Sequence, residues 1–267
     1  MKPILVVVAV SLFLAGCAVF SPSSGVREEP PSELKELTDI YRKKDDAGFS
    51  AFVKTWSDTY KPIPTTSLKQ LPEVVRSSYE IFQLFYSPFN IKRIGGSEWG
   101  DKINEGSKCV VVQDSLNIRV VNSLANYNMT DCPEDLCALQ IEKFRPRLTL
   151  KSKTVLRLTD KYARTLNSFL GTDHTPLGMG NIMSPAQSSG ESERRSDFLR
   201  KQFLVIQGHW GGYWELLTQP QVEYIVFNPE LTEAIVHFQI VYEGGEATFK
   251  RAGGQWKMVK AVRTWIQ

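Results

Sequence analysis

The chain has 267 residues, of which 42% are hydrophobic and 11% aromatic, so it can bury a sizeable core and does not have the composition of a disordered chain. Its 32 basic and 29 acidic residues leave a formal net charge of +3. This near balance argues against general nucleic-acid binding, which needs a concentrated basic surface, so no nucleic acid is expected among the partners.

The N-terminal segment has the layout of a secretory signal peptide. Lys2 precedes a mostly apolar run from Ile4 to Leu14. This run is shorter than the roughly 20 apolar residues that a membrane-spanning helix needs. Two small residues and then Cys17 follow, and the stretch LAGC at 14–17 resembles the lipobox of bacterial lipoproteins.

In lipoproteins the signal peptide is removed in front of this cysteine, which then carries acyl chains. The resemblance implies that residues 1–16 are a signal peptide and that Cys17 is the lipidated first residue. Residues 17–32 are rich in Pro, Ser and Gly and are expected to form a flexible tether. Because Ala18 rather than Asp follows the cysteine, the resemblance implies a cell-envelope protein anchored to the outer membrane and facing the periplasm. The alternatives are an ordinary signal peptide with a chance cysteine and an uncleaved anchor.

Three further cysteines follow Cys17. Cys132 and Cys137 are close in sequence, and an oxidising periplasm would permit a disulfide between them. Cys109 lies in an apolar stretch and is expected to be a buried small hydrophobe. A metal site is the alternative, but no closely spaced Cys or His pair supports it, so no metal and no cofactor are expected.

Residues 33–170 are predicted to form a mixed α/β region that begins with helices. Helical spacing of apolar residues predicts helices over 32–56, divided near 46–48, and over 71–88. Two short strands are expected in each of the ranges 108–122 and 147–159. A further helix is predicted over 160–170, and it should end at Gly171. Residues 171–192 are rich in Gly, Pro and Ser and are expected to form a long loop or linker.

Residues 193–267 carry strand-like runs separated by turn residues, which predict an antiparallel meander. Gly253 and Gly254 are expected to form the last of these turns. Alternate apolar residues over 234–240 predict one buried face, and His237 is expected to be exposed on the other. The predicted fold class is therefore α+β, with a helix-rich N-terminal part and a curved antiparallel sheet at the C-terminus.

The end of the chain, IVHFQIVYEGGEATFKRAGGQWKMVKAVRTWIQ, resembles the nuclear transport factor 2-like (NTF2-like) superfamily. Gly244 and Gly245 match the Gly-rich turn of that pattern, and Trp256, Met258 and Val259 match its last strand. The resemblance implies a cone-shaped sheet that wraps around helices and encloses a pocket. Because NTF2-like folds include both enzymes and non-catalytic binding modules, it implies a pocket and not a reaction.

The stretch GHWGGYWELL at 208–217 holds the best catalytic candidates. Strand alternation places His209, Tyr213 and Glu215 on one side and Trp210 and Trp214 on the other. His209 and Glu215 could pair as a general base and its orienting carboxylate, with Tyr213 contacting a ligand. In the structural alternative the Gly pair bends a strand and the tryptophans build core.

A basic run extends from Lys143 to Arg164, with eight basic residues and a single acidic one. Arg145 and Arg147 flank a proline, a geometry that suits a bidentate contact with an anion such as a lipid headgroup, a lipopolysaccharide phosphate or an acidic glycan. The alternative is a solvated surface with compensating acids elsewhere in the fold.

The function predicted from these features is a lipid-anchored, non-catalytic module that binds a ligand or partner protein at the cell envelope. One alternative is an NTF2-like enzyme, of isomerase, dehydratase or hydrolase type, with His209 and Glu215 in an apolar pocket. Another is a carbohydrate-binding lipoprotein that uses exposed aromatic residues among Trp99, Trp210, Tyr213 and Trp214.

Overall fold

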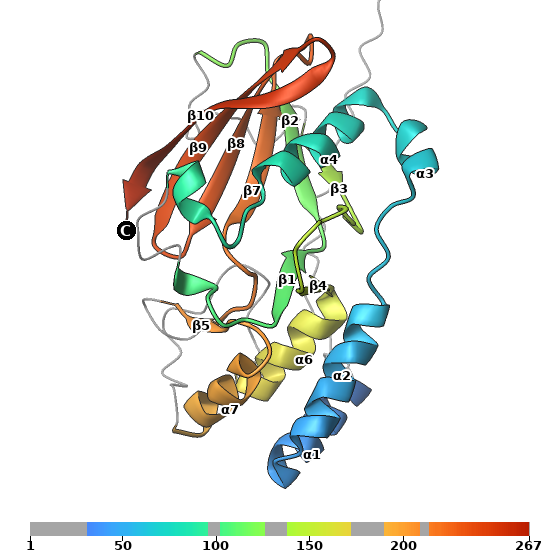
Figure 1. The fold of residues 1–267 in the computed structure, drawn as a ribbon, viewed down its shortest axis with the longest axis vertical. Coiled ribbons are helices and arrows are strands. Elements are labelled where there is room, and N and C mark those ends of the chain that lie inside the picture. The colour runs from blue at the N-terminus through green and yellow to red at the C-terminus, as the bar shows by residue number, and fades with distance from the viewer. Residues whose placement is uncertain (1–30, 96–101, 126–137, 172–189, 209–213, 267) are drawn as a thin grey trace, which may run out of the picture.

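The computed structural model describes residues 31–95, 102–125, 138–171, 190–208 and 214–266 (Figure 1). The helices are α1 (Ser32–Lys43), α2 (Asp46–Asp58), α3 (Thr65–Lys69), α4 (Glu73–Phe85), the 3-10 helix η1 (Ile91–Ile94), α6 (Asp160–Leu170) and α7 (Gly190–Arg200). The strands are β1 (Cys109–Gln113), β2 (Leu116–Val120), β3 (Ala138–Ile141), β4 (Thr154–Leu158), β5 (Ile206–Gln207), β6 (Trp214–Glu215), β7 (Gln221–Phe227), β8 (Glu233–Ile240), β9 (Glu243–Ala252) and β10 (Gln255–Ile266).

The helix boundaries follow the local signals in the sequence. The predicted division of the first helical stretch is confirmed, because α1 ends at Lys43 and the Asp45 carboxylate caps α2 by accepting the Gly48 N–H at 2.8 Å. Helix α6 ends at Gly171, which takes the left-handed conformation (φ 88°) as predicted.

The main sheet has six strands in the order β10-β9-β8-β7-β2-β3. Strands β7 to β10 form the predicted antiparallel meander, whereas β2 pairs in parallel with β7 and thereby adds strands from the N-terminal region. The sheet is therefore mixed and open, with β10 and β3 at its edges. The α+β class is confirmed, with a helix-rich N-terminal part and the meander at the C-terminus.

Two hydrophobic cores meet at β1. In Figure 1 the sheet and α4 make up the upper part of the molecule, and α1, α2, α6 and α7 the lower part. Val110 and Val112 point into the core between the sheet and α4, while Cys109 and Val111 point into the core of the helical part. Strand β1 pairs in parallel with β4 and is apolar on both faces because each face is buried. The predicted burial of Cys109 is confirmed.

The Gly244-Gly245 pair lies inside β9 and does not form the predicted turn. Val241 takes the left-handed position of the β8–β9 turn, with φ 52°. The two glycines instead allow close packing on both faces of the sheet: a Cβ at Gly244 would lie 1.8 Å from the Trp265 ring, and one at Gly245 would lie 2.4 Å from the Val262 carbonyl oxygen.

The next Gly pair does form a turn. Gly253 and Gly254 both have positive φ, and they join β9 to β10 as a two-residue hairpin loop, as predicted.

The exposure predicted for His237 is wrong, since this residue is only 2% exposed. It lies on the sheet face opposite the apolar set, where its ring stacks on Tyr224 at 4.4 Å between centroids. The Arg119 guanidinium carbon lies 4.8 Å from the centre of the same tyrosine ring. Burial lowers the pKa of His237 to about 4, so this imidazole is neutral at pH 7.

Candidate functional site

The predicted site residues divide into those that the structure describes and those that it does not. Glu215, Arg145 and Arg147 are described. Outside the described residues lie Cys17, Cys132, Cys137, His209 and Tyr213, together with Trp99 and Trp210. The lipidation site, the disulfide and the His209–Glu215 pair therefore stay predictions.

Glu215 lies on β6, which pairs with β5 and not with the meander in which it was predicted. Its carboxylate is largely buried and accepts a hydrogen bond from Gln219 Nε2 at 3.2 Å. Burial raises the pKa of Glu215 to about 7. The neighbouring Trp214 is 9% exposed and packs in the helical core, as the strand alternation predicted.

The segment that carries Arg145 and Arg147 is held on both sides by backbone hydrogen bonds. It runs from β3 to β4 through the middle of the view in Figure 1. The Phe144 N–H donates to the Asp114 carbonyl at 2.6 Å, and the Ile63 N–H donates to the Arg145 carbonyl at 3.1 Å. The Phe144 ring is fully buried in the core under the sheet. No strand forms over the first part of the 147–159 run, so only one of its two predicted strands, β4, is present.

Arginine side chains gather around two neighbouring tyrosine hydroxyls. The Tyr60 hydroxyl donates to the Pro146 carbonyl, and the Tyr79 hydroxyl accepts the Arg145 N–H at 3.4 Å. Burial raises the pKa of both tyrosines, and nearby guanidinium charges oppose that rise. Arg145 and Arg157 act on Tyr79, and Arg147 and Arg157 act on Tyr60. We refer to Arg145, Arg147 and Arg157 as the arginine cluster.

Half of the basic run has partners. Arg157 pairs with Asp114 at 3.0 Å, Lys161 pairs with Glu33, and Lys153 donates to the Ser107 carbonyl at 2.5 Å. Arg164 also interacts with another residue. The alternative drawn from the sequence therefore holds for part of the run, because acidic side chains neutralise some of its positive charge.

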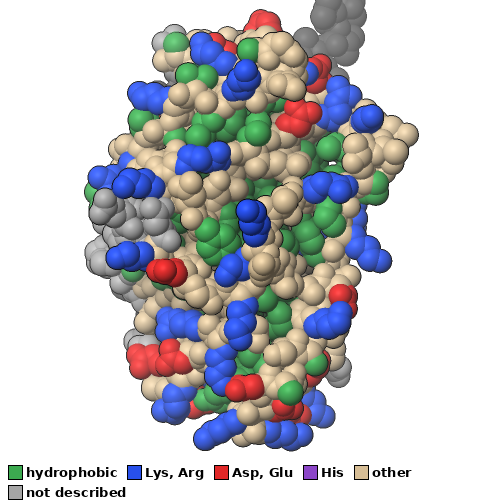
Figure 2. Space-filling view, viewed as in Figure 1, with side chains coloured by type: hydrophobic (Ala, Val, Ile, Leu, Met, Phe, Trp, Pro, Cys, Tyr) green, Lys and Arg blue, Asp and Glu red, His purple; other side chains and the backbone are tan. Residues whose placement is uncertain are grey.

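In the other half of the run, the side chains make no hydrogen bond or ion pair within the part of the chain that the structure describes. These residues are Lys143, Arg145, Arg147 and Lys151. Arg145 stands out among them, because its Nε atom is buried and makes no hydrogen bond to any described residue. A buried guanidinium N–H without an acceptor is costly, and an anion bound at the same guanidinium would offset part of this cost. Figure 2 shows that Lys and Arg spread over this face of the molecule and that its middle part carries few Asp and Glu side chains.

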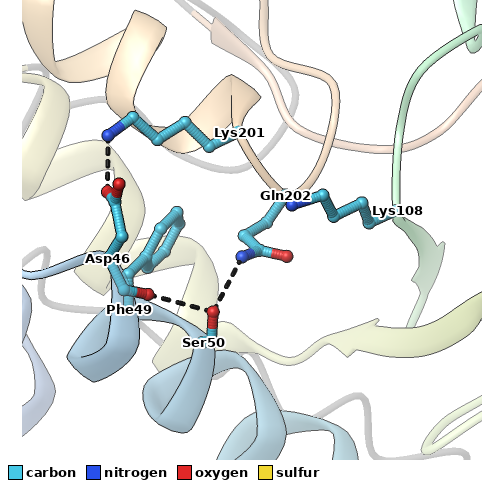
Figure 3. A pocket seen from close by; sticks show the side chains of 6 residues that line it. All are labelled: Asp46, Phe49, Ser50, Lys108, Lys201 and Gln202. Atoms are coloured by element: carbon cyan, nitrogen blue, oxygen red, sulfur yellow. Dashed lines mark hydrogen bonds and ion pairs between the residues drawn. The ribbon is translucent and has the colours of Figure 1, made fainter.

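A second feature, which sequence reasoning missed, is a cavity of about 310 Å³ between α2, the start of β1 and the end of α7 (Figure 3). It is lined by Asp46, Phe49, Ser50, Lys108, Lys201 and Gln202. No sequence signal marks it, because its residues come from three distant segments that only the tertiary fold brings together.

No helix in the described ranges is long and apolar enough to cross a bilayer. No group of three or more His, Cys, Asp and Glu side chains there is arranged to hold a metal ion.

Comparisons of the chain with protein-family models, with curated proteins and with solved structures found no significant match. The function of the chain is therefore inferred from its own residues and from their geometry.

Proposed function

We propose that this chain is a lipid-anchored cell-envelope protein that binds an anionic group, non-catalytically, through its arginine cluster. The observation that carries the proposal is the Arg145 side chain, whose buried Nε makes no hydrogen bond among the described residues. Guanidinium groups favour phosphate and carboxylate oxygens, because their planar N–H groups match the geometry of these anions.

The surroundings of Arg145 favour binding over a purely structural role. Arg147 is exposed and adds a second guanidinium, which acts on Tyr60. Among the described residues, Asp114 is the one carboxylate paired with the cluster, and Arg157 already engages it. An incoming anion would therefore meet a local excess of positive charge on a segment whose backbone is held in place.

The predicted anchor places this surface near an anionic membrane. A chain from Cys17 to Ser32 spans at most about 50 Å when fully extended. Within that reach the arginine cluster could contact lipid phosphates of the same membrane. Lipid phosphate is therefore the ligand that the proposal favours over an acidic glycan.

Vesicle binding tests the arginine cluster. Purified Cys17→Ala protein, which cannot be acylated at that position, is sedimented with phosphatidylcholine vesicles that contain or lack phosphatidylglycerol. We expect binding to depend on phosphatidylglycerol, to weaken with added salt and to fall about tenfold or more in Arg145→Gln/Arg147→Gln. Residues 1–16 are common to both proteins and cannot cause a difference between them.

Lys257→Gln/Lys260→Gln is the matched control, because it removes two exposed cations from β10, at a distance in sequence from the cluster. Equal losses in the two double variants would mean that net charge, and not the cluster, drives binding. The anchor has a separate test: Cys17→Ala should abolish lipoprotein processing in cells, and normal maturation of this variant would contradict the lipidation.

An NTF2-like enzyme is the second candidate, and Glu215 is the observation that favours it. A carboxyl group with a pKa of about 7 is suited to general acid–base catalysis near neutral pH. This candidate also needs His209 close to Glu215. A photo-crosslinker or paramagnetic probe at position 209 that reports no proximity to Glu215 would remove it.

A further inference from the structure

The cavity in Figure 3 has rigid walls. The Gln202 carbonyl accepts two backbone N–H groups, from Lys108 at 2.9 Å and from Cys109 at 2.8 Å, which fixes the end of α7 against the start of β1. On the opposite wall the Phe49 ring stacks on Phe198 at 4.4 Å. A site whose walls are already ordered loses little entropy when a ligand binds.

The charges around the cavity are unequal. Lys201 pairs with Asp46 at 2.5 Å, which neutralises both groups. Lys108 makes no side-chain hydrogen bond or ion pair within the described part of the chain. In Figure 3 its side chain runs over Gln202 in the direction of Lys201. The cavity therefore has a net charge of +1, which suits a ligand with one negative charge.

The hydrogen bonds of Ser50 determine how the Gln202 amide is oriented. The Ser50 hydroxyl donates its proton to the Asp46 carbonyl at 3.0 Å, so its oxygen can only accept from Gln202. Gln202 accordingly presents Nε2 to Ser50 at 3.2 Å. Its carbonyl oxygen Oε1 is left on the other side of the amide, and no partner for it exists among the described residues.

Gln202 is nine-tenths buried and lines the cavity, so a ligand in the cavity could reach its free amide oxygen. A ligand that fits must therefore bring two complementary groups. It needs an anion for the Lys108 ammonium and a hydrogen-bond donor for Gln202 Oε1. The volume of about 310 Å³ lies at the lower end of the range for small-molecule pockets, which restricts the ligand to a small molecule or the end of a chain.

We infer that this cavity binds a carboxylate that carries a hydrogen-bond donor on the neighbouring atom. Lys108 pairs with the carboxylate, Gln202 Oε1 accepts from the donor, and the edge of Phe49 contacts the remainder. Two sources share this chemistry: the carboxyl end of a peptide, whose last N–H is the donor, and a small 2-hydroxy acid, whose hydroxyl is the donor. The site lies apart from the arginine cluster and does not depend on the function proposed for it.

Nuclear magnetic resonance of the full chain in detergent, labelled with 15N-lysine, tests the inference. The backbone N–H of Lys108 bonds to Gln202 and so reports on the cavity wall. The probes are N-acetylglycine for the peptide end, lactate for the hydroxy acid and acetate as a carboxylate without the donor. We expect N-acetylglycine, lactate or both to shift the Lys108 resonance with saturation at millimolar concentration, and acetate to bind at least about fivefold more weakly.

Lys108→Gln removes its own reporter, so binding to this variant is read from the backbone resonance of Lys201, which also lines the cavity. The half-saturation concentration should rise about tenfold, because the variant lacks one charge-assisted hydrogen bond. Lys102→Gln, which removes another exposed lysine nearby in sequence, is the matched control and should leave it unchanged. The inference fails if no probe shifts Lys108, if acetate binds as tightly as the other two, or if the two variants respond alike. The acetate comparison needs only the wild-type chain, so it stands even where a variant folds poorly.

Discussion

Replacement of Glu215 by Gln should stabilise the protein above neutral pH. In the folded chain burial raises the pKa of this carboxyl group from 4.5 to about 7. The unfolded chain therefore loses the proton first as pH rises, and ionisation favours unfolding between pH 4.5 and 7. Stability attributable to the neutral carboxyl is fully present below pH 4.5 and is lost as pH passes 7.

The size of the effect follows from the pKa difference. At about 1.4 kcal/mol for each pH unit, a rise from 4.5 to about 7 corresponds to about 3 kcal/mol, and partial exposure of the side chain reduces this to about 2 kcal/mol. Gln keeps the shape of the side chain and can still accept from Gln219, but it cannot ionise. Glu215→Gln should thus be more stable than the wild type by about 2 kcal/mol at pH 8 and equally stable at pH 4.

Urea unfolding followed by tryptophan fluorescence measures this difference. The matched control is Glu80→Gln on the exposed side of α4, which should change stability by less than about 0.5 kcal/mol at either pH. The reasoning is refuted if Glu215→Gln is no more stable than the wild type at pH 8, or if its advantage is the same at pH 4.

Three further substitutions test the packing and the charge of the fold. Gly244→Ala should lower the free energy of unfolding by about 2 kcal/mol, because its Cβ would overlap the Trp265 ring. Urea unfolding curves measure this loss. If the clash is its cause, the additional substitution Trp265→Ala should restore part of the lost stability. Trp56→Phe removes the Nε1 hydrogen bond to the Arg157 carbonyl at 2.8 Å and should cost about 1–3 kcal/mol in the same assay; a cost near zero would mean that water replaces this bond. Asp114→Asn removes the carboxylate paired with Arg157 and should tighten binding to phosphatidylglycerol vesicles about threefold. Weaker binding by a folded variant would contradict this and would show that Asp114 positions the cluster.

Features that depend on neighbouring residues in the chain were predicted well. Gly171 ends α6, and Gly253-Gly254 forms the last hairpin turn, because both signals act within a few residues. The alternation in β8 likewise predicted its buried face, from Ala234 to Ile240. Each of these depends on local backbone preference or on which face of an element is apolar.

Features that depend on tertiary contacts were missed. His237 is polar and lies on the face opposite the apolar set, but Tyr224 from the neighbouring strand β7 covers it. The Gly244-Gly245 pair reads as a turn in sequence, and only the approach of Trp265 from β10 explains its position inside a strand.

The candidate site was predicted in part. Arg145 and Arg147 are conspicuous in a basic run, whereas their two tyrosine neighbours, Tyr60 and Tyr79, come from a different part of the chain. The sequence could also not separate the paired half of the basic run from the unpaired half, since the acids Glu33 and Asp114 approach it only in the folded chain.

The most direct test of the proposed function is the Nε–H resonance of Arg145 in a chain labelled with 15N-arginine. The labelled chain is titrated with short-chain phosphatidylglycerol and, separately, with short-chain phosphatidylcholine. Arg145 Nε is buried and makes no hydrogen bond among the described residues. An anionic oxygen bound by the same guanidinium should therefore shift its proton resonance, and the shift should saturate. We predict this shift with phosphatidylglycerol and not with phosphatidylcholine. An unchanged Arg145 resonance, or the same shift with both lipids, would contradict anion binding by the arginine cluster.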